Sequence, residues 1–201
     1  MLKYLLAALL LATHAAGAVT LAQLQERFAS QPVIRADFTQ TRQIAGMAQP
    51  LTSRGELLIA QQQGLWWHQR APFSMTLLLD DKRMVQILNG QPPQVVTAEA
   101  NPQMFQFNHL LRALFEADAR VLQENFTLDF QAKGDARWTL ALTPKAPPLN
   151  KIFTRIDLAG DTFLQQIDLK DTQGDRTHIE LSNTRTQPPQ LSAEERARFA
   201  P

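Results

Sequence analysis

Histidines and paired carboxylates are the residues of this chain that could do acid–base or metal chemistry, and they are few. After the first eighteen residues the histidines are His68, His109 and His178. None has the spacing of a metal site, and none accompanies a nucleophile motif such as Gly-x-Ser-x-Gly. The neighbours Asp80 and Asp81 would point to opposite faces of a strand, so a turn explains them better. We therefore expect no catalytic residue, no metal site and no cofactor, and we expect that the protein is not an enzyme.

Cysteine is absent, which excludes disulfides, thiolate metal ligands and thiol catalysis. It also removes the acceptor for lipid attachment, so the chain is not expected to be a lipoprotein itself. The 20 Lys and Arg residues nearly balance the 19 Asp and Glu residues. Such a neutral chain has no electrostatic footprint for nucleic acid or for an anionic membrane. Whatever it binds is expected to be held by apolar contact.

The stretch from Ser53 to Pro72 has the clearest pattern, and it predicts a β-hairpin with a turn at residues 61–64. Alternation places one set of apolar side chains on one face: Leu57, Ile59, Leu65 and Trp67. Glu56, Trp66 and His68 fall on the other face. Because Trp66 and Trp67 are neighbours, each face carries one large aromatic side chain. His68 is best explained as a surface or edge residue.

The rest of the chain supplies more strands and few helices. A short helix is predicted at residues 21–28, capped by Thr20, and a longer one at 102–117, where apolar residues recur every three or four positions. A polar link containing Val121 and Leu122 follows, and a short terminal helix is expected within 191–199. Strands are predicted at 33–42, 73–79, 84–88, 95–97, 126–130, 138–142, 152–158, 163–169 and 178–181. Strands that follow one another without crossovers predict a mainly β (α+β) fold, with a strongly bent antiparallel sheet and helices against one face.

The first eighteen residues differ from the rest. Lys3 precedes an apolar run from Leu5 to Ala12, and Ala16-Gly-Ala18 provides the small residues that a signal peptidase requires. Removing this segment leaves 19 basic and 19 acidic residues. We expect residues 1–18 to be a signal peptide, residues 19–201 to form one domain, and the mature protein to be a periplasmic monomer.

Several motifs together resemble a known family. Ala36-Asp-Phe-Thr-Gln40 is followed by Ser53-x-Gly55-x-Leu57, by Leu65-Trp-Trp67 and by Pro72. This ordered set, directly after a signal peptide, is similar to the start of the periplasmic outer-membrane lipoprotein carriers, the LolA-like family. The resemblance implies an unclosed barrel whose concave apolar face is covered by helices that act as a lid.

The resemblance also implies which residues meet a cargo. The acyl-binding cavity would be lined by Ile34, Phe38, Leu57, Ile59, Trp67, Leu77 and Leu79, and the lid would use Phe107, Leu110, Leu111 and Leu114. The residues alone leave a second interpretation open, because a permanently filled core would use the same side chains.

One position departs from the family pattern. Members of the family carry an arginine, followed by proline, in the turn of the central hairpin, where it hydrogen-bonds the lid. Counting in register from Trp67, the arginine position falls at Gln61 and the proline position at Gln62. A neutral amide can bond a carbonyl but lacks the charged fork of a guanidinium. Arg54 and Arg70 are the nearby residues that could replace it.

The function implied by the resemblance is a carrier, in this case a divergent paralogue. It would take the acyl chains of lipoproteins, or another lipid, from an inner-membrane export machine and pass them to an outer-membrane receptor. The alternative is a lipid- or protein-sensing half-barrel module that regulates an envelope partner.

Overall fold

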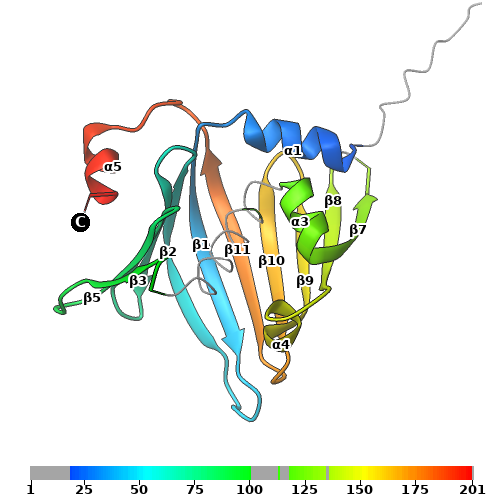
Figure 1. Ribbon diagram of the computed structural model, residues 1–201, viewed down its shortest axis with the longest axis horizontal. Coiled ribbons are helices and arrows are strands. Elements are labelled where there is room, and N and C mark those ends of the chain that lie inside the picture. The colour runs from blue at the N-terminus through cyan, green and yellow to red at the C-terminus, as the bar shows by residue number, and fades with distance from the viewer. Residues whose placement is uncertain (1–18, 101–112, 114–117, 135, 201) are drawn as a thin grey trace, which may run out of the picture.

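The computed structural model describes residues 19–100, 113, 118–134 and 136–200, and within them the chain forms one large antiparallel sheet (Figure 1). Eleven strands lie in the order β6-β5-β4-β3-β2-β1-β11-β10-β9-β8-β7, so β6 and β7 are the two free edges. The strands are β1 (Val33–Gln43), β2 (Leu51–Ala60), β3 (Gly64–Ala71), β4 (Met75–Leu79), β5 (Arg83–Leu88), β6 (Gln94–Thr97), β7 (Phe126–Ala132), β8 (Trp138–Pro144), β9 (Phe153–Gly160), β10 (Leu164–Asp171) and β11 (Arg176–Arg185). The predicted fold class, a bent and unclosed antiparallel sheet with helices, is confirmed.

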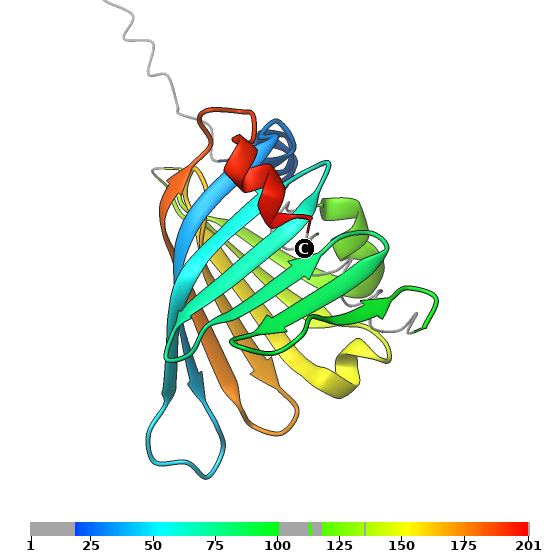
Figure 2. The same cartoon turned by 90° about the vertical axis from the view of Figure 1, so that its left-hand side faces the viewer.

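The sheet curves around helices α1 (Leu21–Ala29) and α3 (Ala119–Asn125), as Figures 1 and 2 show. We call the side that these helices cover the inner face. The short helix α4 (Leu149–Ile152) connects β8 to β9, and α5 (Ala193–Arg198) lies on the opposite, outer face. None of the helices among the described residues is long and apolar enough to cross a membrane.

Helix α1 begins where the sequence predicts. Thr20 Oγ1 accepts from the Gln23 N–H at 3.2 Å, and the Gln23 side chain accepts from the Thr20 N–H at 2.9 Å, which completes a capping box. Leu24 and Phe28, four residues apart on one side of the helix, are buried against the sheet. The predicted helix and its cap are confirmed.

Helix α3 corrects the prediction of a polar link. The Asp118 side chain caps it by accepting from the N–H groups of Arg120 and Val121, and Leu122 is completely buried. A helix of seven residues shows too little apolar repeat to be recognised from periodicity. The helix predicted at 102–117 lies outside the described residues except for Ala113, which is helical and buried in the inner core.

The sheet has an apolar core on each face. The inner core is the larger and joins α1 and α3 to side chains from β1–β4 and β7–β11. The outer core is smaller and consists of Val33, Leu58, Ala60, Trp66, Leu78, Val85 and Phe199. Trp66 and Trp67 therefore lie in different cores, as the alternation predicts.

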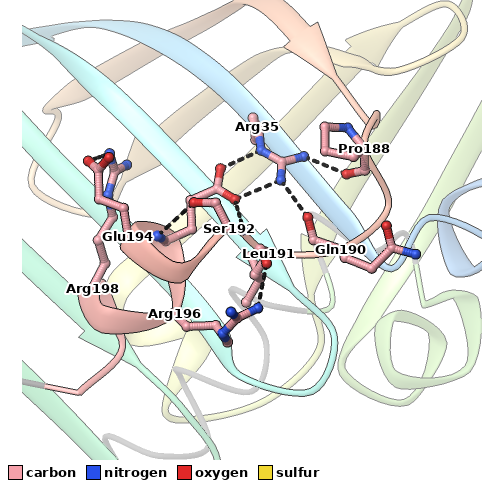
Figure 3. Close-up of polar contacts among 9 residues, drawn as sticks. Arg35, Pro188, Gln190, Leu191, Ser192, Glu194, Arg196 and Arg198 are labelled. Carbon is pink, nitrogen blue, oxygen red and sulfur yellow. Dashed lines mark hydrogen bonds and ion pairs between the residues drawn. The ribbon is translucent and has the colours of Figure 1, made fainter.

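The C-terminal segment closes the outer core with directional polar bonds (Figure 3). Arg35 on β1 holds the Glu195 carboxylate through Nε at 2.5 Å and Nη2 at 2.8 Å. The same guanidinium donates to the carbonyls of Pro188 and Gln190, at 3.0 and 3.1 Å. The Arg198 guanidinium lies 4.5 Å from the centre of the Trp66 ring. A charge-assisted fork and a cation–π contact thus fix α5 on the sheet.

Candidate functional site

An aromatic stack lies on the inner face. The rings of Phe38 and Trp67 have centroids 3.8 Å apart and planes 28° apart. Phe38 is opposite Gly55 on β2, and a Cβ built on Gly55 would lie 2.8 Å from the Phe38 ring and 1.9 Å from the His68 carbonyl oxygen. Only glycine leaves room for this arrangement. The motif residues Phe38, Gly55 and Trp67 are therefore three parts of one packing unit.

The structure brings the predicted cargo-binding residues to one face. Phe38, Leu57, Ile59 and Leu79 are buried in the inner core, and Ile34 and Trp67 are partly buried against it. Leu77 pairs with Trp67 across β3 and β4 but is half-buried and lies outside that core. The predicted lid residues Phe107, Leu110, Leu111 and Leu114 lie outside the described residues.

A small cavity lies beneath α1. It is lined by Phe28, Ile34, Ala36, Leu57, Ile59, Phe163, Leu164, Leu181 and Thr184, and it has about 20 Å³ of free volume. A single water needs roughly 10–15 Å³ of such volume, so a hydrocarbon chain cannot enter this cavity while α1 is seated. Access to this part of the inner face requires α1 to move.

Six of the lining residues were not predicted as site residues from the sequence. They are Phe28 on α1, Ala36 on β1, Phe163 just before β10, Leu164 at the start of β10, and Leu181 and Thr184 on β11. The strands β1 and β11 are adjacent, with Phe38 opposite Leu181, although the two residues are far apart in the chain. No local pattern reveals that pairing; the alternation of Ile179 and Leu181 indicated only that β11 has an apolar face.

Side-chain hydrogen bonds tie the last turn of α1 to its surroundings. Gln61 Nε2 donates to the carbonyl of Ala29, the last residue of α1, at 2.7 Å. Arg27 Nη1 donates to the Asp161 carbonyl at 3.3 Å, and Trp138 Nε1 donates to the same oxygen at 2.8 Å. Trp138 also meets Phe28 edge to face, with centroids 6.2 Å apart. Gln61, at the family's arginine position, thus bonds a covering helix through a neutral amide.

The two nearby arginines lie elsewhere. Arg70 forms an ion pair with Glu56 at 3.0 Å, and Glu56 belongs to the outer face. Arg54 is exposed two residues before Glu56 on the same strand, and it therefore shares that face. Neither side chain points towards the inner face and α1.

The histidines described by the structure are also on the outer face. His68 Nδ1 lies 2.8 Å from Thr76 Oγ1, and its ring stacks on Trp66. Partial burial is the main cause that lowers the pKa of His68; Arg70 and Arg198 lower it further, against the opposing effect of Glu56. His178 bonds Asp168 at 2.7 Å, with both side chains more than 40% exposed. His109 lies outside the described residues.

No group of three or more His, Asp or Glu side chains that could hold a metal ion occurs in the described part of the chain. The inner face instead offers an apolar surface beneath a helix tied by a neutral hydrogen bond from Gln61 and a long one from Arg27. This arrangement can enclose an apolar ligand, if the helix moves, without covalent chemistry.

These features define a half-barrel with a covered apolar face, and the family is now clear. Residues 30–194 match the family model described as "Outer membrane lipoprotein carrier protein LolA". The chain belongs to this family, which confirms the resemblance stated above. Members of the family are periplasmic carrier or binding proteins. No curated protein matches the sequence.

Three solved structures illustrate the similarity. A LolA superfamily protein from Nitrosomonas europaea has 10% identity and a TM-score of 0.46, over 88% of this chain and 97% of the other. A putative outer membrane lipoprotein-sorting protein domain from Vibrio parahaemolyticus has 11% identity and a TM-score of 0.46, over 89% and 97%. The MucA/MucB complex from Pseudomonas aeruginosa has 16% identity and a TM-score of 0.38, over 87% and 62%.

Proposed function

We propose that this protein is a periplasmic carrier that encloses the acyl chains of a lipoprotein, or of another lipid, against its inner face. It would receive them from an inner-membrane export machine and release them to an outer-membrane receptor, without covalent chemistry. The observation that carries the proposal is the apolar inner face beneath α1, which is tied to the sheet through the Gln61–Ala29 bond. Family membership supports the same function.

The energies favour exchange of α1 for a ligand. Seating α1 buries Leu24 and Phe28, which is worth about 3–6 kcal/mol in total. Enclosing about fourteen methylenes of an acyl chain would contribute roughly 11 kcal/mol. An acyl chain can therefore displace the helix, and the cost of opening leaves binding weak enough for release.

The neutral amide at Gln61 sets this protein apart from carriers with an arginine there. An N–H of an amide forms a weaker bond to a carbonyl than a charged guanidinium does. We infer a cover that opens more easily, with a cargo that need not be delivered by an energy-coupled machine. Lipoproteins and free lipids share the acyl chemistry on which the inner face would act.

A brominated acyl probe tests the proposal, because bromine quenches tryptophan fluorescence at contact. The variant Trp66→Phe retains Trp67 on the inner face and removes the outer indole. Trp138 also lies in the inner core, against Phe28, so both variants carry Trp138→Phe as well. We expect saturable quenching in Trp66→Phe, and much less in the matched variant Trp67→Phe. The absence of saturable quenching in both variants and in the unmodified protein would contradict the proposal.

A transfer assay separates the carrier from the sensing module. A carrier moves a labelled lipid from donor vesicles to acceptor vesicles at a rate proportional to its concentration. A sensor with the same inner face binds the lipid and retains it. Saturable binding without transfer would therefore favour the regulatory alternative.

A further inference from the structure

The turns at the two ends of the sheet differ in chemistry. Because every strand is antiparallel to its neighbours, successive turns alternate between the two ends. We call one end of the sheet the polar rim; it holds the β2–β3, β4–β5, β7–β8 and β9–β10 turns. We call the other end the apolar rim; it holds the β1–β2, β3–β4, β5–β6 and β10–β11 turns and α4. It lies at the bottom of Figure 1.

Exposed apolar side chains gather at the apolar rim. Five large apolar side chains are exposed among the described residues, and four of them lie in or beside its connections. These are Met47 at 45%, Leu51 at 51%, Phe73 at 57% and Ile152 at 42% exposure. The fifth, Val95, lies on the edge strand β6. The polar rim carries none of the five; its turns contain residues such as Gln61–Gln63 and Asp80–Lys82.

The longest of these turns, β1–β2, projects beyond the sheet (Figure 2) and is bonded to the neighbouring β10–β11 turn. Asp175 at the β10–β11 turn accepts from the Ala45 N–H at 2.9 Å and pairs with Arg42 at 2.8 Å. Gln43 Nε2 donates to the Met47 carbonyl at 2.7 Å. Internal bonds of this kind reduce the cost of moving the tip out of water, since buried polar groups need partners.

The charges around this rim suit an anionic surface. Residues 43–53, which contain the tip, include no charged side chain. Lys151 and Arg176 are exposed beside Ile152 and the β10–β11 turn. The carboxylates at that turn are already bonded, Asp171 by the N–H groups of Gln173 and Asp175, and Asp175 by Arg42. Apolar tips flanked by basic side chains are typical of surfaces that enter a lipid headgroup layer.

We propose that the apolar rim is a membrane-contact surface that seats Met47, Leu51, Phe73 and Ile152 in the headgroup region of a bilayer containing anionic phospholipids. The neutral net charge predicted no such footprint, because a sum over the chain conceals a local arrangement. The contact is independent of the cargo proposal, since it uses none of the predicted cargo-binding residues.

The absence of cysteine allows a clean test with single labels. Met47→Cys and the matched control Gln62→Cys, on the polar rim, each carry one environment-sensitive fluorophore. The labelled proteins are mixed with vesicles of neutral phospholipid or with vesicles containing phosphatidylglycerol. We expect a blue shift for the label at position 47, larger with phosphatidylglycerol, and none at position 62. Equal shifts at both positions, or no shift at 47, would overturn the proposal.

A second measurement uses the unlabelled chain. Replacing all four rim residues by serine (Met47→Ser, Leu51→Ser, Phe73→Ser and Ile152→Ser) should lower the fraction that sediments with phosphatidylglycerol vesicles by about tenfold or more. Val95→Ser, which removes an exposed apolar side chain from the edge strand β6 and not from a connection of this rim, should lower it far less. Unchanged sedimentation of the fourfold variant, with a normal circular dichroism spectrum, would exclude the rim. Acyl-probe binding without vesicles should be equal in all variants, so the two proposals fail separately.

Discussion

Trp66 and Trp67 are neighbours in one strand, but their surroundings differ. Trp66 lies on the outer face, where Phe199 packs in the same core and Arg198 stacks on its ring. Helix α5, which contains Arg198 and is capped by Phe199, is held by the Arg35–Glu195 ion pair, whose side chains are only 12% and 15% exposed. Trp67 lies on the inner face, against Phe38.

The covers of the two faces differ in the strength of their bonds. The outer cover α5 is fixed by a charged fork in partly buried surroundings. The inner cover α1 is held by a hydrogen bond from the Gln61 amide to the Ala29 carbonyl and by a longer one from Arg27 to the Asp161 carbonyl. Charge-assisted bonds are roughly twice as strong as neutral ones. The difference predicts a permanent closure outside and, if the protein is the proposed carrier, a reversible closure inside.

Gly55→Ala should have the strongest effect of the substitutions considered, because it disrupts the packing of the inner face. A methyl group there meets the His68 carbonyl at 1.9 Å, so the backbone of β2 and β3 must separate. We expect a loss of about 3 kcal/mol or more in the free energy of unfolding, measured by urea denaturation.

Gly46→Ala is the control for this substitution. Gly46 has open space around it but a φ of +84°, so it should lose only the roughly 1–2 kcal/mol of left-handed strain. Equal losses at the two positions would show that the close approach at Gly55 does not limit stability.

Replacing each of the two neighbouring tryptophans by alanine should affect different properties of the protein. Trp66→Ala should cost about 3 kcal/mol of stability, because the residue is only 7% exposed, and should leave acyl-probe affinity unchanged. Trp67→Ala should weaken probe binding by about tenfold, because a carrier would use this partly buried side chain to contact its cargo. Urea denaturation and probe titration measure the two quantities. A loss of binding with Trp66→Ala in a fully folded protein would reverse the assignment of the faces.

The Arg35–Glu195 contact on the outer face should make the stability of the protein depend on pH. The hydrogen bonds from Arg35 lower the pKa of Glu195 from its ordinary 4.5 to about 2. Since the folded-state pKa is depressed, the stabilisation is fully present above about pH 4.5 and is lost as the pH falls towards 2. Glu195→Gln should cost about 2 kcal/mol at pH 7 and reduce the loss of stability between pH 4.5 and 2. Thermal unfolding of both proteins across this range tests it, and identical pH profiles would contradict it.

Local patterns predicted most of the fold. Period-2 alternation placed Leu57 and Trp67 on one face and Trp66 on the other, because the pleat alone decides this. Thr20 identified the start of α1 through its capping chemistry. Helix α3 was missed because seven residues are too few to display a period.

Contacts distant in sequence could not be predicted. The pairing of Phe38 with Leu181 and the bonds of Arg35 to Glu195 join opposite ends of the chain, so neither leaves a local signal. A terminal helix was expected within 191–199, but the face that it covers follows from the Arg35 contact. Gly55 was recognised as part of a motif. The reason that only glycine fits there is the space taken by Phe38 and the His68 carbonyl, and this appears only in the folded sheet.

Substitutions at Gln61 should have the weakest effect, but they test most directly whether α1 opens to admit a ligand. Gln61→Ala removes one exposed neutral hydrogen bond to α1, worth about 0.5–1 kcal/mol. If α1 must open for a ligand to enter, weakening the closed state should raise acyl-probe affinity by about two- to fivefold, since closure and ligand compete. Gln61→Arg should act in the opposite direction, because a guanidinium can form a charge-assisted bond to the Ala29 carbonyl. Probe titration of the three proteins gives the order. If both variants bind the probe as the unmodified protein does, the Gln61 bond does not control access to the inner face, and the difference between the two covers must come from packing alone.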